Sequence, residues 1–136
     1  NEVDSCFVLD SNTICLWTKK QWESEINKRG VKVVALLSTK KIIGIYVVQI
    51  IIDEAQINYF SIKQKYRRKG YGSFLMSSLI KECERLKLKK LLLEVAKNNS
   101  IAENFYNKFN FLTVGLRKNY YKDGTDAVLK EKKIKK

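Results

Sequence analysis

The sequence predicts a mixed α/β domain in which helices pack on the faces of a sheet. Segments rich in valine and isoleucine alternate along the chain with segments whose apolar residues recur at helical spacing. In the middle of the chain a strand, a long helix and a second strand follow one another, an order typical of a βαβ unit with a parallel strand pair. Because the chain has 136 residues, of which 45% are hydrophobic, we expect one domain over residues 1–136 with a packed core.

The N-terminal part of the chain predicts a short strand and a helix. Cys6–Leu9 has the composition of a strand. Thr18 and Gln21 have the spacing of a capping box, in which the side chain of each residue bonds to the backbone of the other. This pattern predicts a helix that runs to about Lys28, with Gly30 placed to end it.

Three strands are predicted after this helix. Val31–Ser38 and Ile42–Asp53 are rich in valine and isoleucine. They flank the polar residues 39–41, which predicts an antiparallel hairpin. Ile57–Ile62 predicts the third strand, which enters the βαβ unit.

Helical spacing of apolar residues returns after the third strand. Leu75, Leu79 and Cys83 lie on one face of a helix expected over residues 71–87, and we expect that face to pack in the core. The apolar segment Leu91–Val95 then predicts a strand buried on both faces, as is usual for a strand with a parallel neighbour.

The chain is predicted to finish with a short helix and two strands. Ser100 and Glu103 have capping-box spacing and predict a helix to about Phe109. Two strands and the turn between them complete the expected elements: Phe111–Lys118, residues 122–124 and Ala127–Glu131. The lysine-rich residues 130–136 predict a flexible basic tail.

The composition of the chain limits its chemistry and its partners. The net charge of +13 implies attraction to an anion, such as phosphate groups, an acidic peptide or RNA. The chain has no histidine, so acid–base chemistry must use carboxylate, tyrosine, lysine or cysteine side chains. Three widely spaced cysteines favour reduced thiols in a cytoplasmic protein over disulfides or a zinc site, so we expect no metal. No apolar segment reaches the length of a membrane span.

Gly70 and Gly72 lie between an expected strand and an expected helix, in the segment YRRKGYGSFL. At such a position free backbone N–H groups and the helix dipole favour an anion. No acidic residue occurs from Ala55 to Lys81, and three basic residues precede the first glycine. Two interpretations stay open from these residues: a phosphate cradle, or a turn beside a solvated basic loop. The third glycine of a dinucleotide-binding fingerprint and the Gly-Lys-Ser/Thr of a P-loop are both absent.

Two polar residues in apolar surroundings are candidates for chemistry. Glu94 lies in the segment Leu91–Val95, where desolvation of a carboxylate is costly, so it either reaches solvent at the strand end or faces a functional cleft. Tyr106 lies on the same helical face as Ala102, and it either packs in the core or presents its hydroxyl to a site. Cys83 falls on an apolar helix face, and we interpret it as a core residue rather than a nucleophile.

Three segments resemble one known family. Arg67–Gly72 is similar to the Q/R-x-x-G-x-G/A signature of the GNAT acetyltransferase superfamily. Asn99–Tyr106, followed by Phe109–Phe111, resembles its second motif, N-x-x-A-x-x-x-Y with a later G-F. Asn110 stands where that motif has glycine, and asparagine tolerates the left-handed conformation. Residues 115–127 resemble the C-terminal signature of ribosomal-protein-alanine N-acetyltransferases of the RimI type.

This resemblance implies the GNAT fold, a mixed and mostly antiparallel sheet with a central βαβ unit and helices on both faces. It also implies acetyl-CoA as cosubstrate, Glu94 as the general base and Tyr106 as the acid that protonates the departing thiolate. The residues that it assigns to acetyl-CoA are Phe60, Ser61, Ile62, Arg68, Lys69, Gly70, Tyr71, Gly72, Ser73 and Asn99. The residues that it assigns to the border of the peptide site are Arg117, Tyr120 and Tyr121.

The activity that the resemblance implies is acetylation of a protein N-terminus by direct attack in a ternary complex. The expected substrate is a ribosomal protein that starts with alanine, and no membrane partner is expected. Two alternatives stay open. A GNAT enzyme would also suit a lysine side chain or a small-molecule amine as acceptor. A basic RNA- or ribosome-binding module would account for the charge without catalysis.

Overall fold

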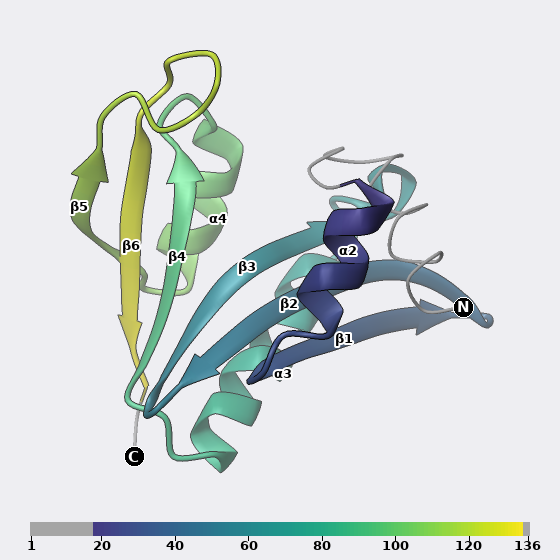
Figure 1. Ribbon diagram of the computed structural model, residues 1–136. Coiled ribbons are helices and arrows are strands. Elements are labelled where there is room, and N and C mark those ends of the chain that lie inside the picture. Colours follow the sequence, from purple (N-terminus) through teal and green to yellow (C-terminus); the bar gives the residue numbers. More distant parts are fainter. Residues whose placement is uncertain (1–17, 135–136) are drawn as a thin grey trace.

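A computed structural model describes residues 18–134, which form a six-stranded sheet in the order β1-β2-β3-β4-β6-β5 (Figure 1). The elements are α2 (Lys19–Ile26), β1 (Val31–Ser38), β2 (Lys41–Ile51), β3 (Glu54–Ile62), the 3₁₀ turn η1 (Gln64–Tyr66), α3 (Tyr71–Arg85), β4 (Lys90–Ala96), α4 (Ser100–Lys108), β5 (Leu112–Arg117) and β6 (Ala127–Lys133). Among the strands of residues 18–134 only β3 and β4 pair in parallel, so the predicted mixed and mostly antiparallel sheet with a central βαβ unit is confirmed. The strand predicted at Cys6–Leu9 lies outside the described residues. In residues 18–134 no helix has the length and apolar character to cross a membrane.

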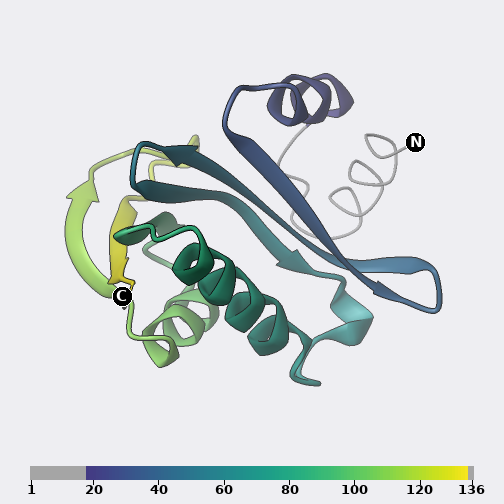
Figure 2. The same cartoon turned by 90° about the horizontal axis from the view of Figure 1, so that it is seen from below.

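Helix α2 covers one face of the sheet (Figure 2). Its predicted capping box is confirmed, because Gln21 N donates to Thr18 Oγ1 over 3.1 Å and Thr18 N donates to Gln21 Oε1 over 2.8 Å. Trp22 is fully buried and packs against Ile45 and Tyr59 of the sheet. The rings of Trp22 and Tyr59 meet edge to face, with centroids 4.9 Å apart. The cap fixes where the helix begins, and the tryptophan anchors it to the sheet.

Helices α3 and α4 cover the opposite face (Figure 2). Leu75, Leu79 and Cys83 of α3 are each at most 2% exposed, as the helical spacing predicted. Burial, with Glu82 and Glu84 nearby, raises the pKa of Cys83 to about 11. The thiol is therefore protonated at neutral pH, which confirms that Cys83 is a core residue.

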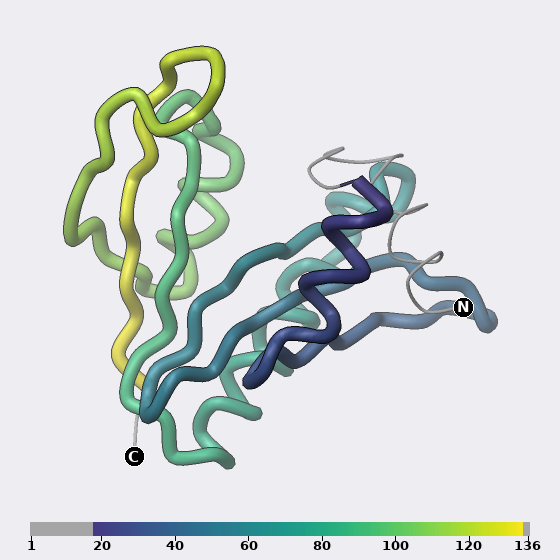
Figure 3. Tube along the Cα trace, in the orientation of Figure 1, coloured from purple at the N-terminus to yellow at the C-terminus, as the bar shows by residue number. Residues whose placement is uncertain are grey.

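Strands β3 and β4 lie side by side only over the first part of each strand. Glu54–Ile57 pairs with Lys90–Leu93, and beyond these residues the two strands diverge. The ribbon and the tube both show this divergence as a V, with β1, β2 and β3 on one arm and β4, β6 and β5 on the other (Figures 1 and 3). From Asn58 onward β3 has no strand partner on the side of β4 within the described part of the chain.

Asn58 is an extra residue in β3 at the point where the V opens. The pairing of β2 with β3 skips Asn58 between Ile57 and Tyr59, which makes a β-bulge. Asn58 Nδ2 donates to Glu25 Oε2 of α2 over 2.8 Å, and Lys28 Nζ donates to Glu25 Oε1 over 2.8 Å. Glu25 is only 7% exposed, so α2 holds the bulge through a buried and paired carboxylate.

Helix α4 begins where predicted, but the residue that caps it is different. Asn99 is the N-cap, since its side chain accepts a hydrogen bond from Ala102 N over 3.1 Å. Ser100 is the first helical residue, so the predicted capping box of Ser100 and Glu103 is wrong. Asn110 follows the helix with a φ of 67°, which confirms its left-handed conformation.

The C-terminal residues are more ordered than their composition predicts. Strand β6 continues to Lys133, and Lys130 and Ile134 are 3% and 8% exposed. Lys130 Nζ donates to Asn107 Oδ1 over 3.1 Å and to Thr113 Oγ1 over 3.0 Å. The prediction of a flexible tail is therefore wrong for residues 130–134. Hydrogen bonds to residues distant in the sequence keep the side chain of Lys130 buried.

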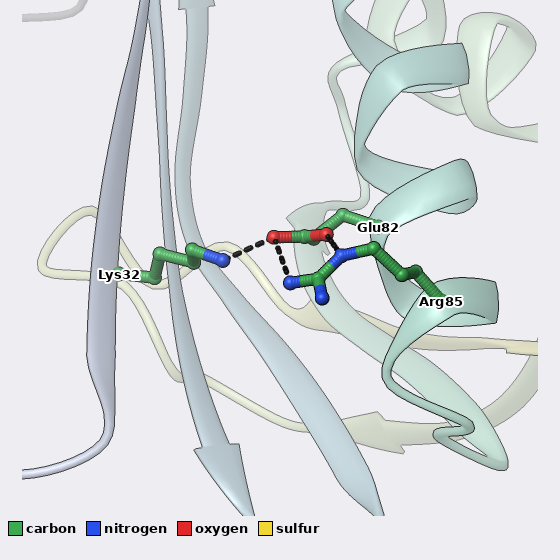
Figure 4. A network of polar contacts seen from close by, with 3 residues as sticks. All are labelled: Lys32, Glu82 and Arg85. Carbon is green, nitrogen blue, oxygen red and sulfur yellow. Dashed lines mark hydrogen bonds and ion pairs between the residues drawn. The ribbon is translucent and has the colours of Figure 1, made fainter.

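A polar network joins β1 to α3 (Figure 4). Glu82 accepts from Arg85 Nε over 2.5 Å and from Arg85 Nη2 over 3.2 Å, and it also pairs with Lys32 of β1. The hydrogen bonds from Arg85 and then from Lys32 lower the pKa of Glu82 to about 2. Since the folded state favours the charged form, the Glu82 carboxylate stabilises the fold at neutral pH.

We expect Glu82→Gln to lower the urea midpoint of unfolding at pH 7. The pKa of Glu82 falls from 4.5 to about 2 on folding, so its contribution is complete above the unfolded value and is lost as the pH falls through the folded value. The difference between wild type and variant should therefore close between about pH 4.5 and about pH 2. Glu84→Gln, the same charge change at an exposed position of α3, is the control. Equal effects of both substitutions would contradict the role of the network.

Candidate active site

The loop before α3 has the backbone geometry of an anion site. Arg68 and Gly70 have left-handed backbones, with φ of 61° and 86°. Gly70 is the N-cap of α3 and supplies no side chain to cap it. The N–H groups of residues 71–73 have no hydrogen-bond acceptor within residues 18–134. These N–H groups and the positive end of the helix dipole are therefore available to a phosphate.

The basic residues of this loop fall into two groups. Arg67 Nε donates to the carbonyl oxygen of Ile62 over 2.8 Å, so its side chain fixes the end of β3. Arg68 and Lys69 are exposed, and neither forms an ion pair with a residue of the described part of the chain. Arg67 is thus part of the scaffold, whereas Arg68 and Lys69 can neutralise a bound anion.

The two glycines of the loop are needed for different reasons. A Cβ on Gly70 would meet nothing within 4 Å, but its φ of 86° strains any residue with a side chain. A Cβ on Gly72 would lie 3.4 Å from Phe105 Cε1 and 3.7 Å from Ile62 Cγ1, which is ordinary van der Waals contact. Gly72 therefore sets a size limit near alanine, because a larger side chain would displace Phe105.

The end of β3 contains a buried polar group without a partner. Ser61 is 5% exposed, and its Oγ has no hydrogen bond to any of the residues that the structure describes. Leaving a buried hydroxyl unsatisfied costs roughly 1–3 kcal/mol, so such a group is a reasonable contact for a bound molecule. The neighbouring Phe60 packs against Phe105 of α4, with ring centroids 5.7 Å apart.

Glu94 lies on the other arm of the V, in the part of β4 that has left β3. Leu93 and Val95 point into the core, so Glu94 points to the opposite face, where its side chain is 23% exposed. Arg117 Nη2 of β5 lies 3.5 Å from Glu94 Oε1. The guanidinium of Arg117 also lies over the ring of Tyr120, 5.5 Å from its centroid. The carboxylate thus reaches a partly exposed face and is paired there.

Three tyrosines connect Glu94 electrostatically to α4. The pKa of Tyr120 is raised mainly by the negative charge of Glu94, and further by burial and by a hydrogen bond with Glu94. Burial and then the charge of Glu94 raise the pKa of Tyr121. Burial and then Tyr121 raise the pKa of Tyr106 to about 12. All three hydroxyls are therefore protonated at neutral pH and can donate hydrogen bonds.

The predicted site residues form two groups, one at the end of each arm of the V. The loop between β5 and β6 carries Tyr120 and Tyr121 and arches beside the end of β4, close to Glu94 (Figure 1). Tyr106 lies on α4, on the core side of β4, where it packs against Phe111 at 5.7 Å between ring centroids. The residues around the start of α3 lie on the arm of β3 instead (Figure 1).

Comparison with known proteins identifies the family. The family model described as "Acetyltransferase (GNAT) family" matches residues 1–111. This chain belongs to the GNAT family. The [ribosomal protein bS18]-alanine N-acetyltransferase of Escherichia coli K12 is 30% identical over 105 residues, which cover 77% of this chain and 70% of that relative.

Solved GNAT structures have the same fold. The crystal structure of the ribosomal-protein-S18-alanine N-acetyltransferase from Escherichia coli matches with a TM-score of 0.92 and 25% identity, over 98% of this chain and 88% of that one. A GNAT acetyltransferase from Elizabethkingia anophelis with acetyl-CoA bound matches with a TM-score of 0.79 and 20% identity, over 92% and 87% of the two chains. The predicted GNAT fold and the assignment as an N-acetyltransferase are confirmed.

Phe105 is a residue of the candidate site that the sequence did not single out. Its ring lies 5.7 Å from Phe60, 5.5 Å from Tyr106 and 5.2 Å from Phe109, measured between centroids, and it also faces Gly72. It therefore joins the loop of one arm to the tyrosine of the other. The sequence signal that could have identified Phe105 is its position next to Tyr106 in the second motif.

The two glycines give a matched stability experiment. We expect Gly70→Ala to lower the free energy of unfolding by roughly 1–2 kcal/mol, the cost of a left-handed residue with a Cβ. Gly72→Ala should cause no such loss, since its Cβ meets only van der Waals contacts. Urea unfolding of both variants tests this difference. An equal loss in the two variants would contradict the separate reasons given for the glycines.

Proposed function

We propose that this GNAT enzyme transfers the acetyl group of acetyl-CoA to the α-amino group of a protein N-terminus, with a ribosomal protein that starts with alanine as substrate. The observation that carries the substrate class is the 30% identity to an Escherichia coli enzyme named for alanine acetylation of ribosomal protein bS18. The pairing of Glu94 with residues of the β5–β6 region supports an acid–base site at the end of β4. A cytoplasmic location, which the cysteine content predicts, belongs to the same proposal.

The residues on the arm of β3 fit acetyl-CoA. The free N–H groups at the start of α3, with Arg68 and Lys69, suit the pyrophosphate. Phe60, Ser61 and Ile62 would bind the acetyl and pantetheine part, and the unsatisfied hydroxyl of Ser61 favours a polar contact there. Asn99 caps α4 with its Oδ1, so its Nδ2 group is left to donate a hydrogen bond to acetyl-CoA. When bound, acetyl-CoA supplies an activated acyl group.

Glu94 and Tyr106 would divide the proton transfers between them. The nitrogen of the acceptor amine attacks the acetyl carbon, and Glu94 accepts the proton that this nitrogen loses. Attack breaks the carbon–sulfur bond and leaves the electron pair on sulfur, to which Tyr106 donates a proton. Its pKa of about 12 keeps Tyr106 protonated over the neutral range, and solvent restores its proton after each turnover.

Substitutions at the two proposed catalytic positions test these roles. Glu94→Gln and Tyr106→Phe should each bind acetyl-CoA as tightly as wild type, because neither side chain is assigned to its phosphates. Each should lower kcat by about 10²–10⁴-fold, the usual contribution of a general acid or base. Calorimetric titration and a thiol-release assay measure the two quantities, with Glu84→Gln as a control that keeps full activity. Full turnover in both variants would refute the assigned roles.

The acceptor is tested with two peptides and with intact ribosomal proteins. A peptide that starts with alanine should be acetylated, and an N-blocked peptide that contains lysine should be acetylated far more slowly. Mass spectrometry of ribosomal proteins after incubation with enzyme and acetyl-CoA should find the added group on an α-amine. Preference for the blocked lysine peptide would replace the proposed acceptor by a lysine side chain.

A further inference from the structure

Glu94, the general base of the proposed function, already has a cation beside it. Arg117 Nη2 lies 3.5 Å from Glu94 Oε1, and the two side chains are 56% and 23% exposed. Among residues 18–134, the other titratable groups that interact with Glu94 are Tyr120 and Tyr121 of the β5–β6 loop, which are neutral at neutral pH. From β6, the residue paired with Glu94 is the apolar Leu129. The charge of the base is thus balanced within the site by one guanidinium.

Arg117 has two neighbours besides Glu94 that favour its position. It is the last residue of β5, where its backbone pairs with Ala127 of β6. Its guanidinium lies over the ring of Tyr120, whose own ring contacts Tyr121 edge to face at 5.1 Å. A guanidinium held by an aromatic face and a strand end loses less freedom on pairing than an unsupported side chain.

An incoming ammonium would compete with this arginine. Both groups carry a positive charge and only hydrogen-bond donors, so both seek the oxygens of Glu94. At a separation of a few ångströms the repulsion by Arg117 is comparable with the attraction to Glu94. A neutral amine meets no such repulsion and keeps the lone pair that attack requires.

We propose that Arg117 selects the acceptor by its protonation state, so that the site admits neutral amines and thereby prefers α-amino groups to lysine side chains. This inference rests on the proposed function of Glu94. An α-amino group has a pKa of about 8 and a lysine side chain one of about 10.4, so at pH 7 roughly one in ten α-amines and one in 2,500 lysines are neutral. Ionisation alone therefore favours the α-amine by about 250-fold.

Arg117 donates no proton in the chemical step. The amine loses one proton to solvent before it binds, and its lone pair forms the nitrogen–carbon bond. The carbon–sulfur bond breaks with its electron pair on sulfur, which takes a proton from Tyr106, while the second proton of nitrogen passes to Glu94. Arg117 touches none of the reacting atoms, so it is a specificity-determining residue and not a catalytic one.

The test compares two acceptors in the same enzyme preparation. The value of kcat/KM is measured at pH 7 for an alanine-starting peptide and for an N-blocked lysine peptide, in wild type, Arg117→Gln and Arg117→Lys. We expect the ratio of the two values to fall at least tenfold in Arg117→Gln, because the ammonium form then gains access to Glu94. Arg117→Lys keeps the charge and should keep the ratio. Both values of kcat/KM come from the same enzyme preparation, so a loss of folded protein lowers both equally and leaves their ratio unchanged.

The wild-type pH profile tests the inference without any substitution. Below the pKa of the peptide amine, kcat/KM for the alanine peptide should rise about tenfold per pH unit and level off near pH 8. A flat profile between pH 6 and pH 7.5 would overturn the selection of neutral amines. An unchanged ratio in Arg117→Gln would also overturn it, while the preference of wild type for the alanine peptide would leave the proposed function standing. Wild-type preference for the lysine peptide would overturn both.

Discussion

The arrangement of the site depends on the bulge at Asn58 in β3. Up to Ile57 this strand is bonded to β4, and beyond it the two strands separate. The extra residue turns Tyr59 toward α2 and Phe60 toward α3 and α4, whereas regular alternation would give the reverse. The hydrogen bond from Asn58 to the buried Glu25 ties the bulge to α2. A helix on the far face of the sheet thus helps to set which side chains face the loop before α3.

Several carboxylates of this basic chain form ion pairs with lysine or arginine, and two of these pairs matter for the fold and the candidate site. Glu82 is held by Lys32 and Arg85, and the result is a lowered pKa that links folding to pH. Glu94 forms a longer ion pair with Arg117, at 3.5 Å, at the end of a strand where the acceptor amine would enter in our proposal. The same physical interaction therefore stabilises the fold in one place and, in our proposal, limits the acceptor in the other.

Most parts of the fold that depend on local sequence were predicted correctly, whereas the cap of α4 and the burial of Lys130 were not. Helical spacing predicted the buried face of α3, and the capping box at Thr18 was correct because both of its partners are close in sequence. The neighbouring polar residues Asn99 and Ser100 could not be ranked as caps without the backbone. Lys130 was assigned to a tail because its partners lie on α4 and β5. The candidate site came from motif spacing, which contains no information on the Arg117 pairing.

The placement of the two proposed catalytic groups agrees with what acyl transfer requires. A base has to lie on the side from which the amine approaches, and an acid on the side toward which sulfur departs. Glu94 faces away from the core, and Tyr106 lies on the core side of the same strand. Tyr121 interacts electrostatically with both Glu94 and Tyr106, so this tyrosine links the two faces of the strand. In the proposed mechanism the amine reaches the carbonyl carbon of the thioester from the side of Glu94, and the sulfur departs toward Tyr106.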